Sequence, residues 1–157
     1  MKIKLLVIGK TDDENLSALI DMYIKRLKHY ISIEIQVIPD IRAAKNLTTE
    51  QQKEREGELV LNALENSDML ILMDENGQQL GSAEFAQYLQ KKMNSGIKLM
   101  VLVVGGPFGF SKAVYERAQG KISLSKMTFS HQMVRLFLAE QLYRAFTILN
   151  NEPYHHE

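Results

Sequence analysis

The sequence predicts an α/β fold, a mostly parallel sheet with helices on both faces. Short apolar runs rich in β-branched residues alternate along the chain with segments whose apolar residues recur at helical spacing. One run, residues 99–104, is apolar throughout, as strands buried on both faces of a parallel sheet are. The 157 residues contain no repeat and no long linker, so we expect residues 1–157 to form one domain.

The first half of the chain is predicted to hold three strands and two helices. Residues 3–8 and 33–38 are expected strands, and the apolar residues between them, from Leu16 to Leu27, have helical spacing. Residues 49–64 begin polar and end in an apolar stripe, which is typical of a helix, and residues 69–73 form the next buried strand. The polar stretch 39–48 is expected to be a surface connection.

The second half continues the alternation. Phe85, Leu89 and Met93 share one side of a predicted helix over residues 84–93, and the strand 99–104 follows. After Gly105 and Gly106 come a short helix near 111–117, a strand near 122–124 and a long helix over 131–149. These elements complete the predicted sheet.

The last predicted helix is apolar nearly all round and so has to be covered on more than one face. A chain this small has few other elements that could bury these apolar faces, and a second subunit could bury them. We therefore predict a homodimer that packs through this helix. Arg135 and Arg144 are either structural residues with buried stems or anion contacts, and position alone leaves both open.

Composition excludes several classes of function. The absence of cysteine excludes disulfides, thiolate nucleophiles and sulfur-ligated metal sites. A net charge of zero argues against strong non-specific binding of nucleic acid, but residues 91–157 carry 9 basic and 4 acidic residues against 10 and 15 in residues 1–90. The C-terminal part is therefore the better candidate for an anionic partner, unless helix surfaces simply differ in charge. No segment predicts a membrane span or a signal peptide, so we expect a cytoplasmic protein.

Ligands of parallel α/β sheets bind at the carboxyl ends of the strands. Three segments lie there, residues 73–77, 104–109 and 124–129. The glycine-rich segment 104–109 matches neither a dinucleotide fingerprint nor a phosphate loop. It is either a tight turn without a ligand or a loop whose backbone holds a small organic ligand.

The C-terminal residues 150–157 include Tyr154, His155 and His156, which are unusual in a frayed end. A remnant of an affinity tag or a metal site would be alternative readings. Two histidines are too few for a tag, and no other cluster has metal-ligand spacing, so we expect no metal.

Four segments in order, residues 104–109, 124–135, 140–145 and 153–155, resemble the signature of the RlmH family of SPOUT-class methyltransferases. The resemblance spans the chain and implies a C-terminal trefoil knot in which S-adenosylmethionine binds. The cofactor residues that it implies are Met73, Gly105, Leu124, Ser125, Lys126, Met127, Thr128 and Phe129. Met73 replaces a common leucine of similar volume, and Ser130 replaces a common proline, which is expected to loosen the entry to the last helix.

The same resemblance implies methylation of N3 of pseudouridine 1915 in 23S ribosomal RNA of assembled ribosomes. This imide nitrogen must lose its proton, so the reaction requires a base or an anion stabiliser. Our hypothesis is that Tyr154 and His155 bind or deprotonate the base, that Arg144 holds a phosphate or the imide charge, and that two subunits share the site. Alternatives are an enzyme acting on another RNA such as transfer RNA, a non-catalytic ribosome-binding module, and an unrelated nucleotide-binding α/β protein.

Overall fold

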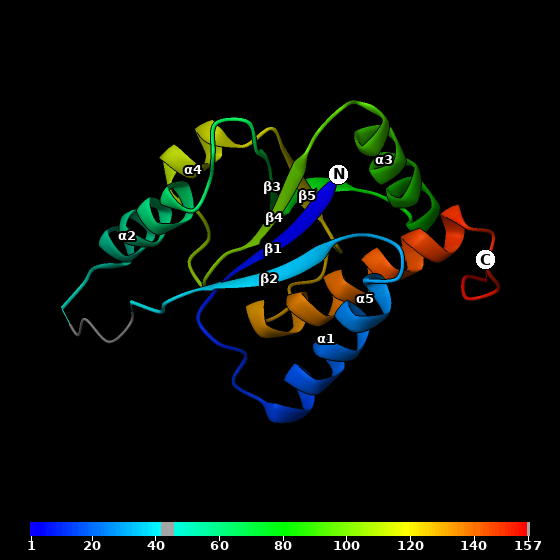
Figure 1. Ribbon diagram of the computed structural model, residues 1–157. Coiled ribbons are helices and arrows are strands. Elements are labelled where there is room, and N and C mark those ends of the chain that lie inside the picture. Colours follow the sequence, from blue (N-terminus) through cyan, green and yellow to red (C-terminus); the bar gives the residue numbers. More distant parts are fainter. Residues whose placement is uncertain (42–45, 157) are drawn as a thin grey trace.

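A five-stranded parallel sheet forms the centre of the computed structural model, which describes residues 1–41 and 46–156 (Figure 1). The strand order is β2-β1-β4-β3-β5, and all four pairings are parallel. The strands are β1 (Lys2–Ile8), β2 (Ile33–Ile38), β3 (Met69–Gln79), β4 (Leu99–Val104) and β5 (Gly120–Ser123). The order is consistent with the trefoil knot that the resemblance implies.

Five helices cover the two faces of this sheet within the described ranges. They are α1 (Glu14–Leu27), α2 (Thr49–Asn62), α3 (Ser82–Asn94), α4 (Lys112–Arg117) and α5 (His131–Leu149). Leu5 of β1 packs in the apolar cluster that includes residues of α1, α3 and α5, whereas Leu6 packs in the cluster that includes α2 and α4. Successive side chains of a strand point to opposite faces, so each helix group covers one face. The predicted α/β fold with helices on both faces is confirmed.

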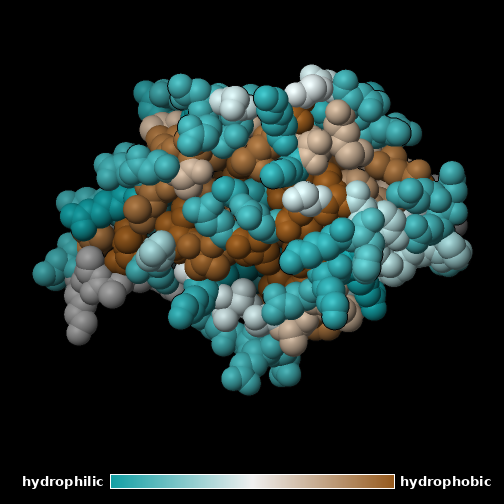
Figure 2. Space-filling view, viewed as in Figure 1, coloured by the Kyte–Doolittle hydropathy of each residue, from teal (hydrophilic) through white to brown (hydrophobic). Residues whose placement is uncertain are grey.

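The apolar core is visible along the sheet. Figure 2 shows hydrophobic residues in a band where the strands lie in Figure 1, with hydrophilic residues on the helices around it. Five of the six residues of β4 are buried and Leu99 is half-buried, as the fully apolar run 99–104 predicts. None of the helices in the described part of the chain is long and apolar enough to cross a membrane.

The main difference from the prediction lies in β3. This strand continues to Gln79, whereas the apolar pattern predicts an end at Met73. Met73 and Gln78 both pair with Ile122, so residues 74–77 bulge out of the ladder between them. A bulge next to a strand end re-aims side chains, and it carries this polar segment to the carboxyl edge of the sheet.

Two side chains fix the start of α5 at the same edge. The buried Arg135 guanidinium donates hydrogen bonds to the carbonyls of Ile8 (2.6 Å) and Gly9 (2.9 Å), which identifies Arg135 as a structural residue. The hydroxyl of Ser130 caps α5 by accepting a hydrogen bond from the Met133 amide at 3.2 Å. Serine at this position therefore supplies a hydrogen-bonded cap, which a proline side chain cannot form.

Candidate functional site

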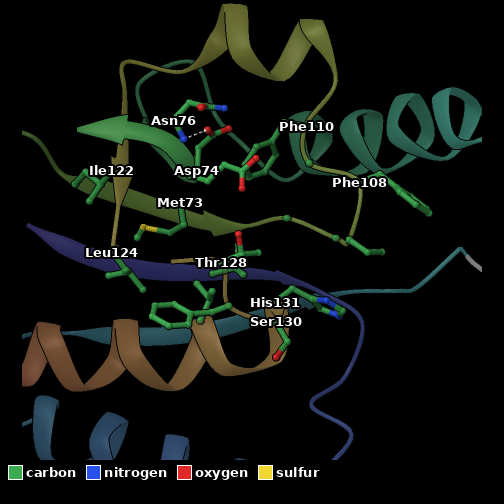
Figure 3. A pocket seen from close by; sticks show the side chains of 18 of the residues that line it. Met73, Asp74, Asn76, Phe108, Phe110, Ile122, Leu124, Thr128, Ser130 and His131 are labelled. Atoms are coloured by element: carbon green, nitrogen blue, oxygen red, sulfur yellow. Dashed lines mark hydrogen bonds between the residues drawn. The ribbon is translucent and has the colours of Figure 1, made fainter. Parts of the chain in front are cut away.

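A cavity of about 500 Å³ lies where the bulge of β3 meets the carboxyl ends of β4 and β5 (Figure 3). Most of its wall comes from three segments, residues 73–76 at the bulge of β3, residues 104–110 after β4, and residues 124–131, apart from Lys126, after β5. Ile122, Tyr115 and Val134 complete the lining. The three strand ends singled out in the sequence thus meet around one cavity, of a size suited to a small organic ligand.

Seven of the eight predicted cofactor residues line this cavity, and Lys126 does not. The seven are Met73, Gly105, Leu124, Ser125, Met127, Thr128 and Phe129. Local hydrogen bonds shape their loop: the Ser123 hydroxyl donates to the Ser125 carbonyl, and the Ser125 hydroxyl accepts from the Met127 amide, both at 2.9 Å. Lys126 belongs to the same turn but lies outside the lining.

Glycine is required in the loop between β4 and α4 because other groups pack against its backbone. A β-carbon on Gly105 would lie 3.0 Å from the Phe110 ring, and one on Gly106 would lie 2.8 Å from a carboxylate oxygen of Glu56. Gly109 has φ +80°, a conformation that side chains with a β-carbon rarely adopt. All three glycines line the cavity, and because they have no side chain they present backbone atoms to it.

Polar groups concentrate on the β3 side of the cavity. The Tyr115 hydroxyl donates a hydrogen bond to Oδ2 of Asp74, and the backbone N–H of Asn76 donates to Oδ1 of Asp74 at 2.8 Å. Burial and the hydrogen bond to Asp74 raise the pKa of Tyr115 to about 12, so the phenol stays protonated at neutral pH. Asp74 is thereby held in one orientation, and together with Glu75 it places negative charge at the cavity wall.

Several residues that line the cavity have no predicted role. Asp74 and Asn76 stand in the strand-end segment 73–77, and Phe108 stands in the glycine-rich segment, so position at the carboxyl edge was the available signal. His131 belongs to the motif that resembles the RlmH signature. Tyr115 lies on a short helix, and no sequence pattern marks it.

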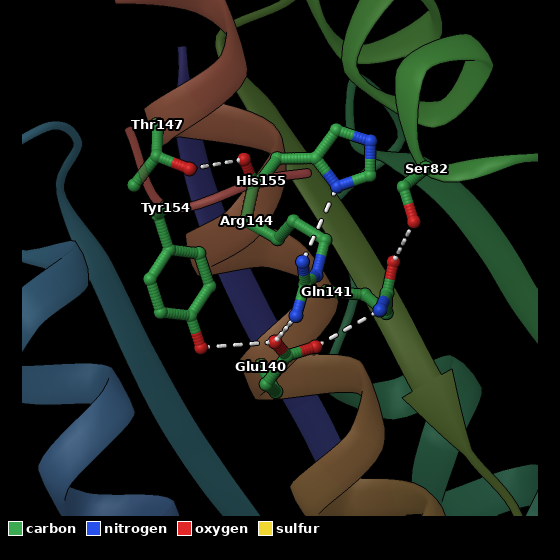
Figure 4. A network of polar contacts seen from close by, with 7 residues as sticks. All are labelled: Ser82, Glu140, Gln141, Arg144, Thr147, Tyr154 and His155. Carbon is green, nitrogen blue, oxygen red and sulfur yellow. Dashed lines mark hydrogen bonds and ion pairs between the residues drawn. The ribbon is translucent and has the colours of Figure 1, made fainter. Parts of the chain in front are cut away.

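The three predicted catalytic residues form one polar network with Glu140 near the C-terminal end of α5 (Figure 4). Arg144 donates to Glu140 Oε1 at 2.6 Å, and the Tyr154 hydroxyl donates to the same oxygen at 3.0 Å. A second nitrogen of Arg144 lies 3.2 Å from Nδ1 of His155. The Arg144 guanidinium also lies over the Tyr154 ring, 4.9 Å from its centroid.

In this network Glu140 is the acceptor that Arg144 and Tyr154 share, and Arg144 and Tyr154 are donors. The hydrogen bond with Glu140 raises the pKa of Arg144. Burial is the largest cause of the raised pKa of Tyr154, and hydrogen bonds with Tyr23 and Glu140 raise it further. Both groups therefore stay protonated. A guanidinium has no acceptor, so Nδ1 of His155 accepts from Arg144 and the proton of the neutral ring is on Nε2. The site can therefore stabilise negative charge.

Within one chain the network and the cavity are separate. None of Arg144, Tyr154 and His155 lines the cavity, which reaches along α5 only to Val134. Arg144 is ten residues further along the helix, roughly 15 Å at 1.5 Å per residue. Across residues 1–41 and 46–156, no group of three or more His, Asp or Glu side chains is arranged to hold a metal ion.

Comparisons with known proteins agree on one family. The family model described as "Predicted SPOUT methyltransferase" matches residues 1–155. The chain is 62% identical over 156 residues to "Ribosomal RNA large subunit methyltransferase H" of Christiangramia forsetii, covering 99% of both chains. It is 62% identical to the protein of that name from Flavobacterium johnsoniae and 56% to one from Porphyromonas gingivalis, with full coverage of all chains.

A solved structure shares the fold. It is "the structure of a probable methylase family protein from Haemophilus influenzae", with a TM-score of 0.58 and 13% sequence identity. The match covers 99% of this chain and 70% of the other. At this identity the likeness concerns the fold alone.

Proposed function

The chain belongs to the SPOUT methyltransferase family, and from this we propose that it methylates large-subunit ribosomal RNA in the cytoplasm. The reaction that we propose is methyl transfer from S-adenosylmethionine to N3 of pseudouridine 1915 in 23S ribosomal RNA of assembled ribosomes. Full-length relatives that are 62% identical carry the name of a ribosomal RNA methyltransferase, which supports the substrate class. The observation that carries the proposal is the cavity, because seven of the eight residues that we expect to bind the cofactor are among those that line it.

The lining of this cavity fits S-adenosylmethionine. Apolar side chains such as Met73, Leu124 and Phe129 suit an adenine ring, and the exposed backbone of the glycine loop suits its polar edge. Asp74 and Glu75 suit the positive charge of the sulfonium and amino groups. When bound, this cofactor supplies a methyl group on a cationic sulfur, and such a transfer requires no metal.

We propose that Arg144, Tyr154 and His155 act on the nucleobase. Methyl transfer to an imide nitrogen requires loss of its proton, and negative charge develops on the ring as the proton leaves. The network offers the remaining N–H groups of Arg144 and Nε2–H of His155 as donors to the carbonyl oxygens that carry this charge, while the Tyr154 hydroxyl donates to Glu140 and helps to position Arg144. As arranged, these groups support anion stabilisation better than proton abstraction.

A homodimer would bring the network and the cavity together. On the outer side of α5, Met133 is exposed and Leu136 and Phe137 are half-buried, which leaves an apolar surface between the two sites. In a two-fold dimer with α5 packed against its copy in the opposite direction, the start of one helix meets the end of the other. The network of one protomer would then face the cavity of its partner, which is the shared site that we propose.

The test is methyl transfer from labelled S-adenosylmethionine to three substrates in parallel. These are assembled ribosomes that lack the modification, free large-subunit RNA and transfer RNA. We expect label in ribosomes alone, at the pseudouridine. Label in transfer RNA would overturn the substrate, and cofactor binding without label in any RNA would leave a non-catalytic binding protein.

A further inference from the structure

A second arginine, Arg26, extends the Arg144 network onto another helix. Arg26 lies in the last turn of α1, and its guanidinium carbon is 5.6 Å from the ring centroids of both Tyr23 and Tyr143. Tyr143 in turn makes an edge contact with Tyr154, at 4.8 Å between centroids. Three tyrosine rings thus connect two guanidinium groups, those of Arg26 and Arg144.

The two arginines differ in how their charge is balanced. Arg144 is paired with Glu140 at 2.6 Å. Arg26 is exposed, and among the described residues its guanidinium has no hydrogen bond or ion pair, only the two ring contacts. The rings hold the guanidinium in position, while its N–H groups stay available to an outside acceptor.

The surroundings of Arg26 are basic. Lys25, Lys28 and His29 are exposed neighbours on the same segment, and the nearest acidic residues in sequence are Asp21 and Glu34. Lys25 and Lys28 form no ion pair in the part of the chain that the structure describes. Glu34 is paired with Lys4 of the neighbouring strand at 3.5 Å. Glu152 accepts a hydrogen bond from the Tyr30 hydroxyl just after this segment, so the excess of positive charge is confined to residues 25–29.

We propose that Arg26 binds a phosphate of the RNA strand that carries the target nucleotide, with Tyr23 and Tyr143 holding its guanidinium. An arginine fork matches the oxygens of a phosphodiester, and basic surfaces interleaved with aromatic rings are typical of nucleic-acid-binding proteins. The inference rests on the proposed function, because it assigns the RNA-binding role to the surface beside the residues that we expect to contact the nucleobase.

A helix-capping role is the competing explanation. A cation in the last turn of a helix interacts favourably with the helix dipole, and this interaction requires only the charge. A capping residue would affect stability but not the binding of ribosomes. Binding of phosphate, by contrast, releases counterions and so makes substrate affinity depend on salt.

The experiment compares Arg26→Gln with Arg55→Gln in steady-state methylation of ribosomes over a series of KCl concentrations. Arg55 is an exposed arginine of α2, on the opposite face of the sheet, and serves as the matched control. For Arg26→Gln we expect KM for ribosomes to rise about fivefold or more, with kcat within about twofold and the slope of log KM against log[KCl] lower by about one. Arg26→Lys keeps the charge but not the fork, so we expect an intermediate KM with an unchanged slope.

Calorimetric binding of S-adenosylmethionine and thermal unfolding separate this effect from misfolding, and both should match the wild type. Equal KM and slope for Arg26→Gln and Arg55→Gln would overturn the phosphate contact. Loss of thermal stability with unchanged KM would assign Arg26 to helix capping instead. Absence of methylation by the wild-type protein would contradict the proposed function itself, so the two failures are distinguishable.

Discussion

Gly77 lies directly against the backbone of Ile122, across the bulge that separates the two halves of β3. A β-carbon at Gly77 would be 2.6 Å from both the amide nitrogen and the carbonyl carbon of Ile122, and 2.7 Å from the carbonyl carbon of Lys121. Real β-carbons do not approach backbone atoms this closely. The residue that lets β3 close over β5 is therefore fixed as glycine by packing.

Gly77→Ala is expected to destabilise the protein by at least about 3 kcal/mol, or to prevent folding, because backbone on two strands would have to separate. Urea unfolding followed by circular dichroism measures the change. Gly81→Ala is the control, since a β-carbon there meets only a Glu84 oxygen at 3.4 Å, and it should cost about 1 kcal/mol or less. Similar stabilities for the two variants would contradict the close packing at Ile122.

Tyr115→Phe tests whether the orientation of Asp74 matters for cofactor binding. The substitution removes the hydroxyl that donates to Asp74 but keeps the ring and its edge contact with Phe110. We expect the Kd for S-adenosylmethionine to rise about fivefold to tenfold, which corresponds to about 1 to 1.4 kcal/mol. Isothermal titration calorimetry measures it, and a Kd equal to that of the wild type would show that Asp74 needs no such partner.

The sheet, its helices and the edge that holds the cavity could be predicted from the sequence, because apolar periodicity and strand ends are local properties. The bulge at residues 74–77 could not, because it depends on pairing with Ile122, some 45 residues away. The sequence shows a glycine at position 77, but the reason that only glycine fits there is the backbone of Ile122, which is close in space and far along the chain. The same holds for Tyr115, whose partner Asp74 lies 41 residues earlier.

The C-terminal residues 150–157, the tail, and the network that they form with α5 likewise depend on contacts in space. Arg144, Tyr154 and His155 were found through resemblance, and the structure adds that Glu140 joins Arg144 to Tyr154. Arg26 was missed because a lone arginine near a helix end has a capping explanation. Only the ring contacts with Tyr23 and Tyr143 connect it to the network.

Glu140→Gln tests that connection. The substitution weakens the charge-assisted bonds that orient Arg144 and Tyr154, so we expect kcat on ribosomes to fall about tenfold to a hundredfold. Cofactor affinity should stay within about twofold, since Glu140 does not line the cavity. Glu116→Gln, at an exposed ion pair with Lys112, is the control and should be neutral. An unchanged kcat for Glu140→Gln would remove the orienting role.

The alkaline titration of the tyrosines provides a pH test. A hydrogen bond to Glu152 raises the pKa of Tyr30 to about 12 from an ordinary value of 10. Because the folded-state pKa is raised, this bond contributes its full stability below about pH 10, and the contribution is lost as the pH rises through about 12. Ultraviolet titration should show that some tyrosines ionise only well above pH 10. The Tyr30→Phe variant should have one such late-ionising tyrosine fewer than the wild type. Ionisation of all tyrosines near pH 10, as in the urea-unfolded chain, would contradict the bond.

Mixed dimers test whether two subunits share a site. Gly105→Val should block the cavity, since a β-carbon there already meets Phe110 at 3.0 Å, and His155→Ala should disable the tail. We expect each variant alone to be inactive on ribosomes. When the two are co-expressed with different tags at equal levels, half of the dimers are mixed, and each mixed dimer holds one intact cavity facing one intact tail. Activity should therefore return to about a quarter of the wild-type value. If cavity and tail act within the same chain, no mixed dimer contains a complete site and the mixture stays inactive.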